Sequence, residues 1–136
     1  MLDMSVVLNL KVSDVMKEAV FTSPNVNILS VAKLMYSKKI GSIAIVSPDD
    51  KVIGIFTERD LTKVVAENTP LTKSIGEVMS KNPWVIKESD SISKAVSLMY
   101  EKEIRHLPVV DSEGKLKGII TSRDLAGILS KLTSLE

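Results

Sequence analysis

The chain has 136 residues, of which 44% are hydrophobic, and its 18 basic and 17 acidic residues leave a net charge of +1. The two signs are mixed along the chain, which argues against a nucleic-acid arm or a disordered tail. The absence of cysteine excludes a disulfide framework and thiolate chemistry. No window approaches 18 apolar residues, so we expect a cytoplasmic protein without a membrane segment.

Two stretches of the chain repeat one another. Residues 28–61 recur without a gap at 92–125, 64 positions later, and Val12-Ser-Asp-Val-Met16 recurs as Ile75-Gly-Glu-Val-Met79, 63 positions later. A unit of about 60 residues is marginally stable alone, so we expect the two copies to pack together. The predicted division is an N-terminal extension at 1–11, a first repeat at 12–70 and a second repeat at 71–136.

Taken in chain order, each repeat predicts a short helix, a short strand, a long helix, a two-stranded hairpin and a final helix. Val6 to Leu10 of the extension is predicted to be either an added strand or an arm onto a dimer mate. The apolar runs 43–46 and 107–110 predict strands buried on both faces. One buried helical face is predicted from apolar residues at i, i+3, i+4 and i+7: Ile28, Val31, Ala32 and Met35, repeated as Ile92, Ala95, Val96 and Met99.

The sharpest local match follows the returning strand of each hairpin. Gly54-Ile-Phe-Thr57-Glu-Arg59-Asp60 recurs as Gly118-Ile-Ile-Thr121-Ser-Arg123-Asp124. One interpretation is a capping box, in which Thr and Asp satisfy the free N–H groups of the helix. The other is a phosphate site, because a helix N-terminus attracts anions and arginine binds phosphate bidentately. A strand glycine at the same place in both copies indicates a close approach to the backbone.

These motifs, in order and twice, resemble a tandem pair of cystathionine-β-synthase (CBS) domains, often called a Bateman module. The resemblance also includes the Val-Met starts and the Leu-Pro-Val-Val-Asp strand at 107–111. It implies an α/β fold in which two βαββα repeats pack sheet to sheet about a pseudo-twofold axis. It further implies that an adenosine compound binds in the cleft between the repeats, with AMP, ADP or ATP preferred and S-adenosylmethionine or a dinucleotide as the alternative.

The same resemblance assigns roles to individual residues. Asp60 and Asp124 would bind ribose hydroxyls, and the neighbouring Thr and Arg side chains would face phosphates. Adenine would lie near Ile28 and Ile92. The implied ligand-binding set is Ser23, Gly41, Ser42, Thr57, Arg59, Asp60, Lys87, Arg105, His106, Thr121, Arg123 and Asp124.

The two copies depart unequally from the family pattern. The first has Ile43-Ala44 where Leu-Pro is usual, and the second has Lys87-Glu88 where a small residue and proline are common. Arg105 and His106 give the second copy more positive charge, so we expect it to favour phosphate-rich ligands. His106 is the only histidine and there is no cysteine, so no metal site is expected.

We therefore expect a regulatory ligand sensor that is not an enzyme, has no catalytic cofactor and forms a homodimer by family resemblance. Its output would pass to a separate enzyme or transporter. The alternative is a dimerising interaction scaffold in which the Thr and Asp side chains are caps only. Nucleic-acid binding is not expected, because it would require a basic cluster that the sequence lacks.

Overall fold

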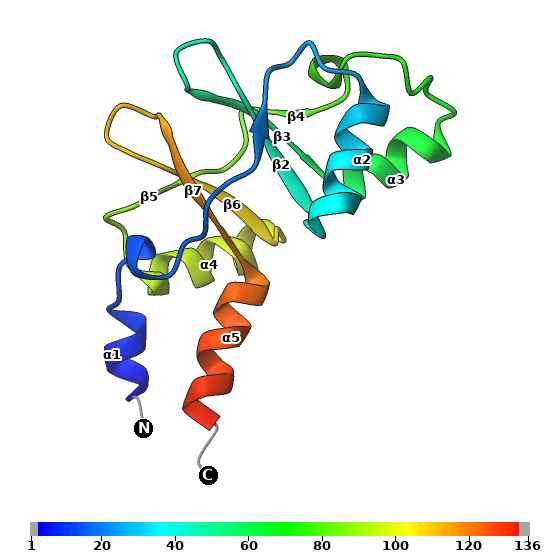
Figure 1. Cartoon of the computed structure of the whole chain (residues 1–136). Helices are drawn as coiled ribbons and strands as arrows, with labels where there is room; N and C mark the ends of the chain where they lie inside the picture. The colour runs from blue at the N-terminus through cyan, green and yellow to red at the C-terminus, as the bar shows by residue number, and fades with distance from the viewer. Residues whose placement is uncertain (1–2, 134–136) are drawn as a thin grey trace. The chain divides into compact units, whose positions relative to one another are not determined.

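The computed structural model describes residues 3–133; residues 1–2 and 134–136, at the outer ends of the predicted extension and second repeat, lie outside the described residues. The chain forms two compact units (Figure 1). Among the described residues, unit 1 consists of 3–18, 84–113 and 117–133, and unit 2 consists of 19–83 and 114–116. The mixed α/β class and the two tandem repeats predicted from the sequence are confirmed.

Unit 2 is built on a four-stranded sheet with the order β1-β2-β3-β4. β1 is parallel to β2, and the β2–β3 hairpin and the β3–β4 pair are antiparallel. Helix α2 lies against β2, and α3 lies against β3 (Figure 1). The elements are β1 (Phe21–Thr22), α2 (Ile28–Lys38), β2 (Ser42–Val46), β3 (Val52–Thr57), α3 (Glu58–Ala66), the 3-10 helix η2 (Ile75–Glu77) and β4 (Ser80–Lys81).

Unit 1 is built on a three-stranded sheet with the order β5-β6-β7, in which β5 and β6 are parallel. Helix α4 lies against β6 and also contacts α1 and α5. The elements are α1 (Met4–Leu8), the 3-10 helix η1 (Val12–Asp14), β5 (Ile86–Lys87), α4 (Ile92–Lys102), β6 (His106–Val110), β7 (Leu116–Thr121) and α5 (Ser122–Thr133).

The leading segment of each repeat, 12–17 in the first and 75–80 in the second, packs with the body of the other repeat. Val12 is fully buried in the core of unit 1, and its N–H donates to the Asp90 carbonyl at 2.8 Å. Ile75 is fully buried in the core of unit 2, and its N–H donates to the Val26 carbonyl at 2.7 Å. Each compact unit therefore contains residues of both sequence repeats.

The two long helices begin and end at equivalent places. Asn27 and Ser91 cap their N-termini by accepting backbone N–H groups at 2.8 and 3.2 Å. Lys39 and Glu103 end the helices in the left-handed conformation, with φ near 55° (56° and 53°). Burial of the predicted stripe is confirmed at most positions, but it is wrong at Val96, which is 43% exposed.

The extension contains a helix where the sequence predicted a strand or an arm. The Asp3 carboxylate accepts the Ser5 N–H at 2.8 Å and so caps α1. Val7 is buried, and the Leu10 carbonyl accepts the Ile92 N–H at 2.8 Å, which ties the extension to the start of α4. The strand interpretation was wrong because β-branched valines suggest a strand, whereas the cap and the burial of Val7 favour a short helix.

Pro108 shifts the pairing of β5 relative to that of β1. In unit 2 the Ala44 N–H donates to the Val20 carbonyl at 3.1 Å, and Phe21 pairs with Ala44. Pro108 is the counterpart of Ala44 and has no N–H to donate. The pairing in unit 1 consequently starts one residue later, at Ile86 with Val109.

Candidate functional site

Both copies of the Gly-x-x-Thr-x-Arg-Asp motif form a capping box where a strand ends and a helix begins. In unit 2 the Asp60 Oδ2 accepts the Thr57 N–H at 2.9 Å and the Thr57 hydroxyl at 3.1 Å, while the Asp60 N–H donates to Thr57 Oγ1 at 3.3 Å. The corresponding distances between Thr121 and Asp124 in unit 1 are 2.9, 2.9 and 3.2 Å. The capping interpretation is confirmed, and it commits only one oxygen of each carboxylate.

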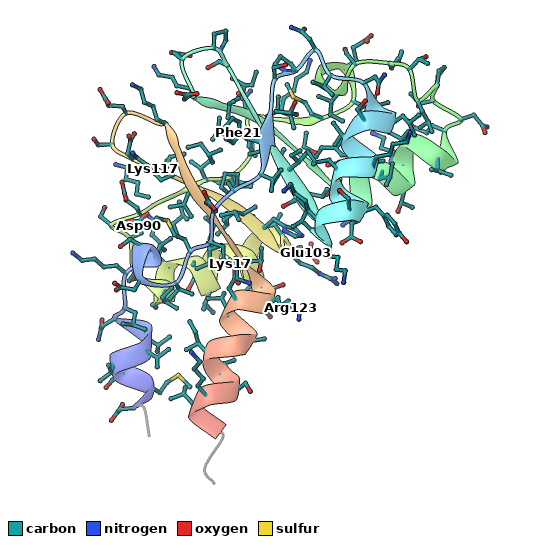
Figure 2. The ribbon with its side chains drawn as sticks, in the orientation of Figure 1. Lys17, Phe21, Asp90, Glu103, Lys117 and Arg123 are labelled. Atoms are coloured by element: carbon teal, nitrogen blue, oxygen red, sulfur yellow. The ribbon has the colours of Figure 1, made fainter. Side chains whose placement is uncertain are left out.

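The other carboxylate oxygen is contacted by the leading segment of the opposite repeat. The Ser80 hydroxyl donates to Asp60 Oδ1 at 3.0 Å, and the Lys17 ammonium lies 2.7 Å from Asp124 Oδ1. The Asp124 side chain is 3% exposed, whereas the Lys17 side chain is 66% exposed. Figure 2 shows Lys17 on the segment beside β7 and Arg123 at the start of α5.

Sequence reasoning missed Lys17 and Ser80 as members of the site. They occupy equivalent positions, because each directly follows the methionine of a repeated Val-Met pair. The repeat offset of 63 therefore contained the signal that they correspond to one another. Nothing in the sequence indicated that each would contact the aspartate of the other repeat.

Most N–H groups at the two helix N-termini are already bonded within the chain. The Glu58 N–H donates to the Gly41 carbonyl at 3.0 Å, and the Ser122 N–H donates to the Arg105 carbonyl at 2.9 Å. Together with the capping boxes, these bonds occupy the N–H groups of Glu58 and Asp60 in α3 and those of Ser122 and Asp124 in α5. They also place Gly41 and Arg105 directly beside the Thr-x-Arg-Asp segments.

The repeated strand glycines are close to the leading segments. A Cβ on Gly118 would lie 2.7 Å from the Lys17 carbonyl oxygen and 2.9 Å from Met16 Sδ. A Cβ on Gly54 would collide with the side chain of Met79. The predicted close approach to the backbone is confirmed, and the group that approaches is the chain itself.

The other predicted site residues lie at different distances from the two motifs. Ser42 is buried in β2, and His106 is half-buried at the start of β6; each has an interaction partner. Ser23 follows β1 and Lys87 lies in β5, so a whole strand separates each of them from the motif-bearing β3 or β7. Two strand spacings are about 10 Å, which is the separation of β1 from β3 and of β5 from β7 across the sheets.

The isoleucines expected beside adenine belong to the cores. Ile28 is 0% exposed and Ile92 is 2% exposed, at the starts of α2 and α4. The position of adenine near these two residues stays a prediction.

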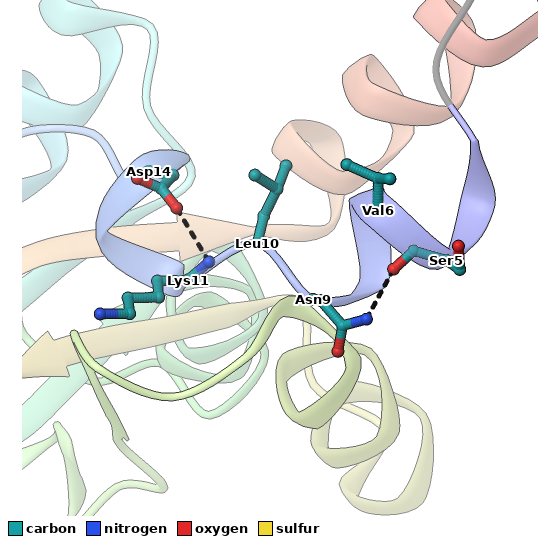
Figure 3. Close-up of a pocket in the computed structure, with 6 residues that line it drawn as sticks. All are labelled: Ser5, Val6, Asn9, Leu10, Lys11 and Asp14. Atoms are coloured by element: carbon teal, nitrogen blue, oxygen red, sulfur yellow. Dashed lines mark hydrogen bonds between the residues drawn. The ribbon is translucent and has the colours of Figure 1, made fainter.

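A hollow of about 600 Å³ lies apart from these motifs, between α1 and η1 (Figure 3). It is lined by Ser5, Val6, Asn9, Leu10, Lys11 and Asp14. Its polar groups bond to each other: the Asn9 amide donates to the Ser5 carbonyl at 2.8 Å, and the Lys11 N–H donates to Asp14 at 2.9 Å. These bonds stabilise the end of α1 and the start of η1. The hollow contains none of the predicted ligand residues.

Within residues 3–133, no group of three or more His, Asp or Glu side chains is arranged to hold a metal ion. In the same range, no helix is long and apolar enough to cross a membrane.

A model of the CBS domain matches the chain twice, at residues 12–67 and 75–131. The chain belongs to the CBS-domain family. The two matches follow the repeats, and both Thr-x-Arg-Asp segments lie within them.

Relatives of this CBS pair include both small proteins and large enzymes. An uncharacterised 17.7 kDa protein of Acidianus ambivalens is 34% identical over 127 residues, which are 93% of this chain and 77% of that protein. Protein MK0525 of Methanopyrus kandleri is 39% identical over 120 residues, 86% of this chain and 61% of the relative. Inosine-5'-monophosphate dehydrogenase of Methanocaldococcus jannaschii is 34% identical over 82% of this chain, but the match spans only 22% of the enzyme.

Solved structures with the same fold include CBS pairs bound to adenosine compounds. The CBS pair of protein MJ0100, in complex with 5'-methylthioadenosine and S-adenosyl-L-methionine, is 28% identical, with a TM-score of 0.85 over 91% of this chain and 98% of that one. Protein PAE2072 of Pyrobaculum aerophilum, complexed with AMP, is 24% identical, with a TM-score of 0.83 over 93% of this chain and all of that one. The second similarity concerns the fold alone.

Proposed function

We propose that this CBS pair is a regulatory module without catalytic activity that binds adenosine-containing ligands at its two Thr-x-Arg-Asp motifs. One observation supports the proposal above the others: in Asp60 and Asp124, one carboxylate oxygen faces an exposed side chain that a ligand can displace. A carboxylate oxygen of this kind accepts hydrogen bonds from a pair of ribose hydroxyls. Each binding site would use both repeats, because Ser80 and Lys17 come from the repeat opposite to the aspartate.

The proposed roles follow from the chemistry of each side chain and from its place in the strands and helices around the two motifs. Asp60 and Asp124 would accept the ribose hydroxyls, while Thr57 and Thr121 would face the ligand as they cap the helices. The nearby side chains with donors for phosphate would be Arg59, Arg105 and Arg123, followed by Ser42 and His106. Gly41 would leave room for the ligand in unit 2, and Ser23 and Lys87 would act at the outer edge of each site.

The adenosine moiety is the part of the ligand with the strongest support. The 28%-identical CBS pair of MJ0100 was solved with 5'-methylthioadenosine and S-adenosyl-L-methionine. We keep AMP, ADP or ATP as the leading proposal, because an arginine recurs in both motifs and arginine suits phosphate. S-Adenosylmethionine and dinucleotides are the alternative ligands.

The output of the module would be read by a separate enzyme or transporter. A ligand would bias the conformation of the pair only to the extent that it binds one state more tightly than the other. The homodimer and the cytoplasmic location stay predictions. The competing proposal is an interaction scaffold in which both Thr–Asp pairs serve as caps and no nucleotide binds.

The test is thermal unfolding with AMP, ADP, ATP, S-adenosylmethionine and 5'-methylthioadenosine, combined with calorimetric titration. A ligand at one hundred times its dissociation constant adds about 2.7 kcal/mol to the free energy of unfolding. We expect stabilisation by at least one compound, and its loss in the Asp60→Asn/Asp124→Asn double variant. Asp14→Asn is the matched control, because that carboxylate also accepts a backbone N–H but lies outside both motifs. No binding of any compound at millimolar concentration would refute the proposal and favour the scaffold.

A further inference from the structure

The two aspartates differ in the chemistry of the group that covers them. The Ser80 hydroxyl covers Asp60 and is neutral, whereas the Lys17 ammonium covers Asp124 and carries a full charge. These two residues are equivalent in the repeats, so the difference arises from one substitution at a single repeated position.

A ribose hydroxyl can replace Ser80 with little change in the bonding of Asp60. One hydroxyl donor leaves and another takes its place, so the carboxylate keeps a neutral partner. Replacement of Lys17 is a different exchange, because it separates an ammonium from a carboxylate whose side chain is only 3% exposed and puts a neutral donor in its place. Asp124 is also more deeply buried than Asp60, so its charge depends more on the cation beside it.

Charges at two further repeated positions favour an anion near Asp124. The residue whose carbonyl accepts the first N–H of the helix is Arg105 in unit 1 and Gly41 in unit 2. The first residue of the helix is the neutral Ser122 in unit 1 and the acidic Glu58 in unit 2. With Lys17 included, three repeated positions are more positive beside Asp124 than beside Asp60, whereas Glu18 and Glu103 of unit 1 stand where unit 2 has Lys81 and Lys39.

The Lys17 side chain is able to move when a ligand arrives. It is 66% exposed, and its ammonium stands at the end of a flexible four-carbon stem. A ribose that takes its place on Asp124 leaves the ammonium in need of another anion. A phosphate attached to that ribose would supply the anion next to the same site.

We propose that Lys17 makes the Asp124 site selective for adenosine ligands that bear a phosphate, while the Asp60 site also accepts ligands without one. This inference rests on the proposed function and adds a division of labour between the two sites. A ligand without a phosphate competes with Lys17 for Asp124 and gives the displaced ammonium no partner. A phosphorylated ligand gives Lys17 a new partner and so fills both sites.

The test is calorimetric titration of the full chain with adenosine, as the neutral probe, and with AMP. We expect one adenosine and two AMP molecules per chain in the wild type. In Asp60→Asn, adenosine binding should be lost and one AMP should remain. Lys17→Ser places in unit 1 the residue that unit 2 has at the equivalent position. This variant should bind a second adenosine, and the dissociation constant of its second AMP should rise by about tenfold. In the reciprocal Ser80→Lys variant, adenosine should no longer bind.

Lys94→Ser is the matched control, because Lys94 forms an exposed ion pair with Asp90 at 3.3 Å elsewhere in unit 1. It should leave both stoichiometries unchanged. Equal numbers of adenosine and AMP in the wild type, unchanged by Lys17→Ser, would overturn the inference and leave the proposed function intact. Failure of adenosine and AMP to bind would also overturn it, and the proposed function would then be decided by the remaining compounds of the panel.

Discussion

The contact between Gly118 and the leading segment gives the sharpest prediction for stability. The backbones of Lys17 and Ile119 exchange two hydrogen bonds of 2.9 Å beside this glycine. A methyl group in Gly118→Ala would stand 2.7 Å from the Lys17 carbonyl oxygen, which is backbone and is fixed by one of those bonds. The substitution therefore pushes the leading segment away from β7.

The magnitude follows from three contributions. Two weakened hydrogen bonds cost about 1 kcal/mol each, and overpacking adds about 1–3 kcal/mol. Replacement of glycine in a strand returns about 0.5–1 kcal/mol. We expect a net loss of about 2–4 kcal/mol in the free energy of unfolding, measured by urea denaturation, and a fall in Tm of about 6–12 °C.

Two other glycines supply the controls. In Gly54→Ala the new methyl group contacts only the side chain of Met79, which can rotate away. We therefore expect the free energy of unfolding to fall by less than about 1.5 kcal/mol. Gly127 lies within α5, and a Cβ added there would have no neighbour within 4 Å. Gly127→Ala should therefore raise the free energy of unfolding by about 0.5–1 kcal/mol. If Gly118→Ala is no more destabilising than Gly54→Ala, the argument from a rigid backbone contact is wrong.

Two further substitutions test the site and the core. Asp124→Asn should lower the free energy of unfolding by about 1–2 kcal/mol more than Asp60→Asn does. The amide at position 124 would face the Lys17 ammonium, which cannot accept a hydrogen bond, whereas the amide at position 60 would face the Ser80 hydroxyl, which can. Equal urea midpoints for the two variants would contradict this. Phe56→Ala should cost about 3–5 kcal/mol, because the side chain is fully buried in unit 2; a loss below about 1 kcal/mol by the same measurement would show that the core there repacks freely.

The local features of this fold could be predicted from sequence because they depend on short-range patterns that occur twice. The capping boxes need only Thr and Asp three residues apart at the start of a helix, and both formed as predicted. The buried helical faces followed from periodicity, except at Val96, where the chain leaves an apolar residue exposed. The periodicity predicts which face of a helix is apolar, but it does not predict how much of that face the neighbouring elements cover.

The partners of the aspartates could not be predicted in the same way. Lys17 lies more than a hundred positions from Asp124, and Ser80 lies twenty positions from Asp60. A repeated sequence states that two segments are equivalent, but it does not say which copy each segment packs against. The assignment of Lys17 to Asp124 depends on packing of η1 into the core of unit 1, which only the structure reveals.

The exchange of leading segments has a consequence for how such a protein arises by gene duplication. A single ancestral repeat would contain a core that lacks its buried Val12 or Ile75 counterpart, and it would complete that core by swapping this segment with a second molecule. Fusion of two copies turns the swap into an intramolecular event, with an effective concentration of the order of millimolar for a short linker. Folding of the fused chain then no longer depends on protein concentration. The two aspartate sites are also free to diverge, because the residues that cover them, Lys17 and Ser80, are separate positions of one chain and can mutate independently.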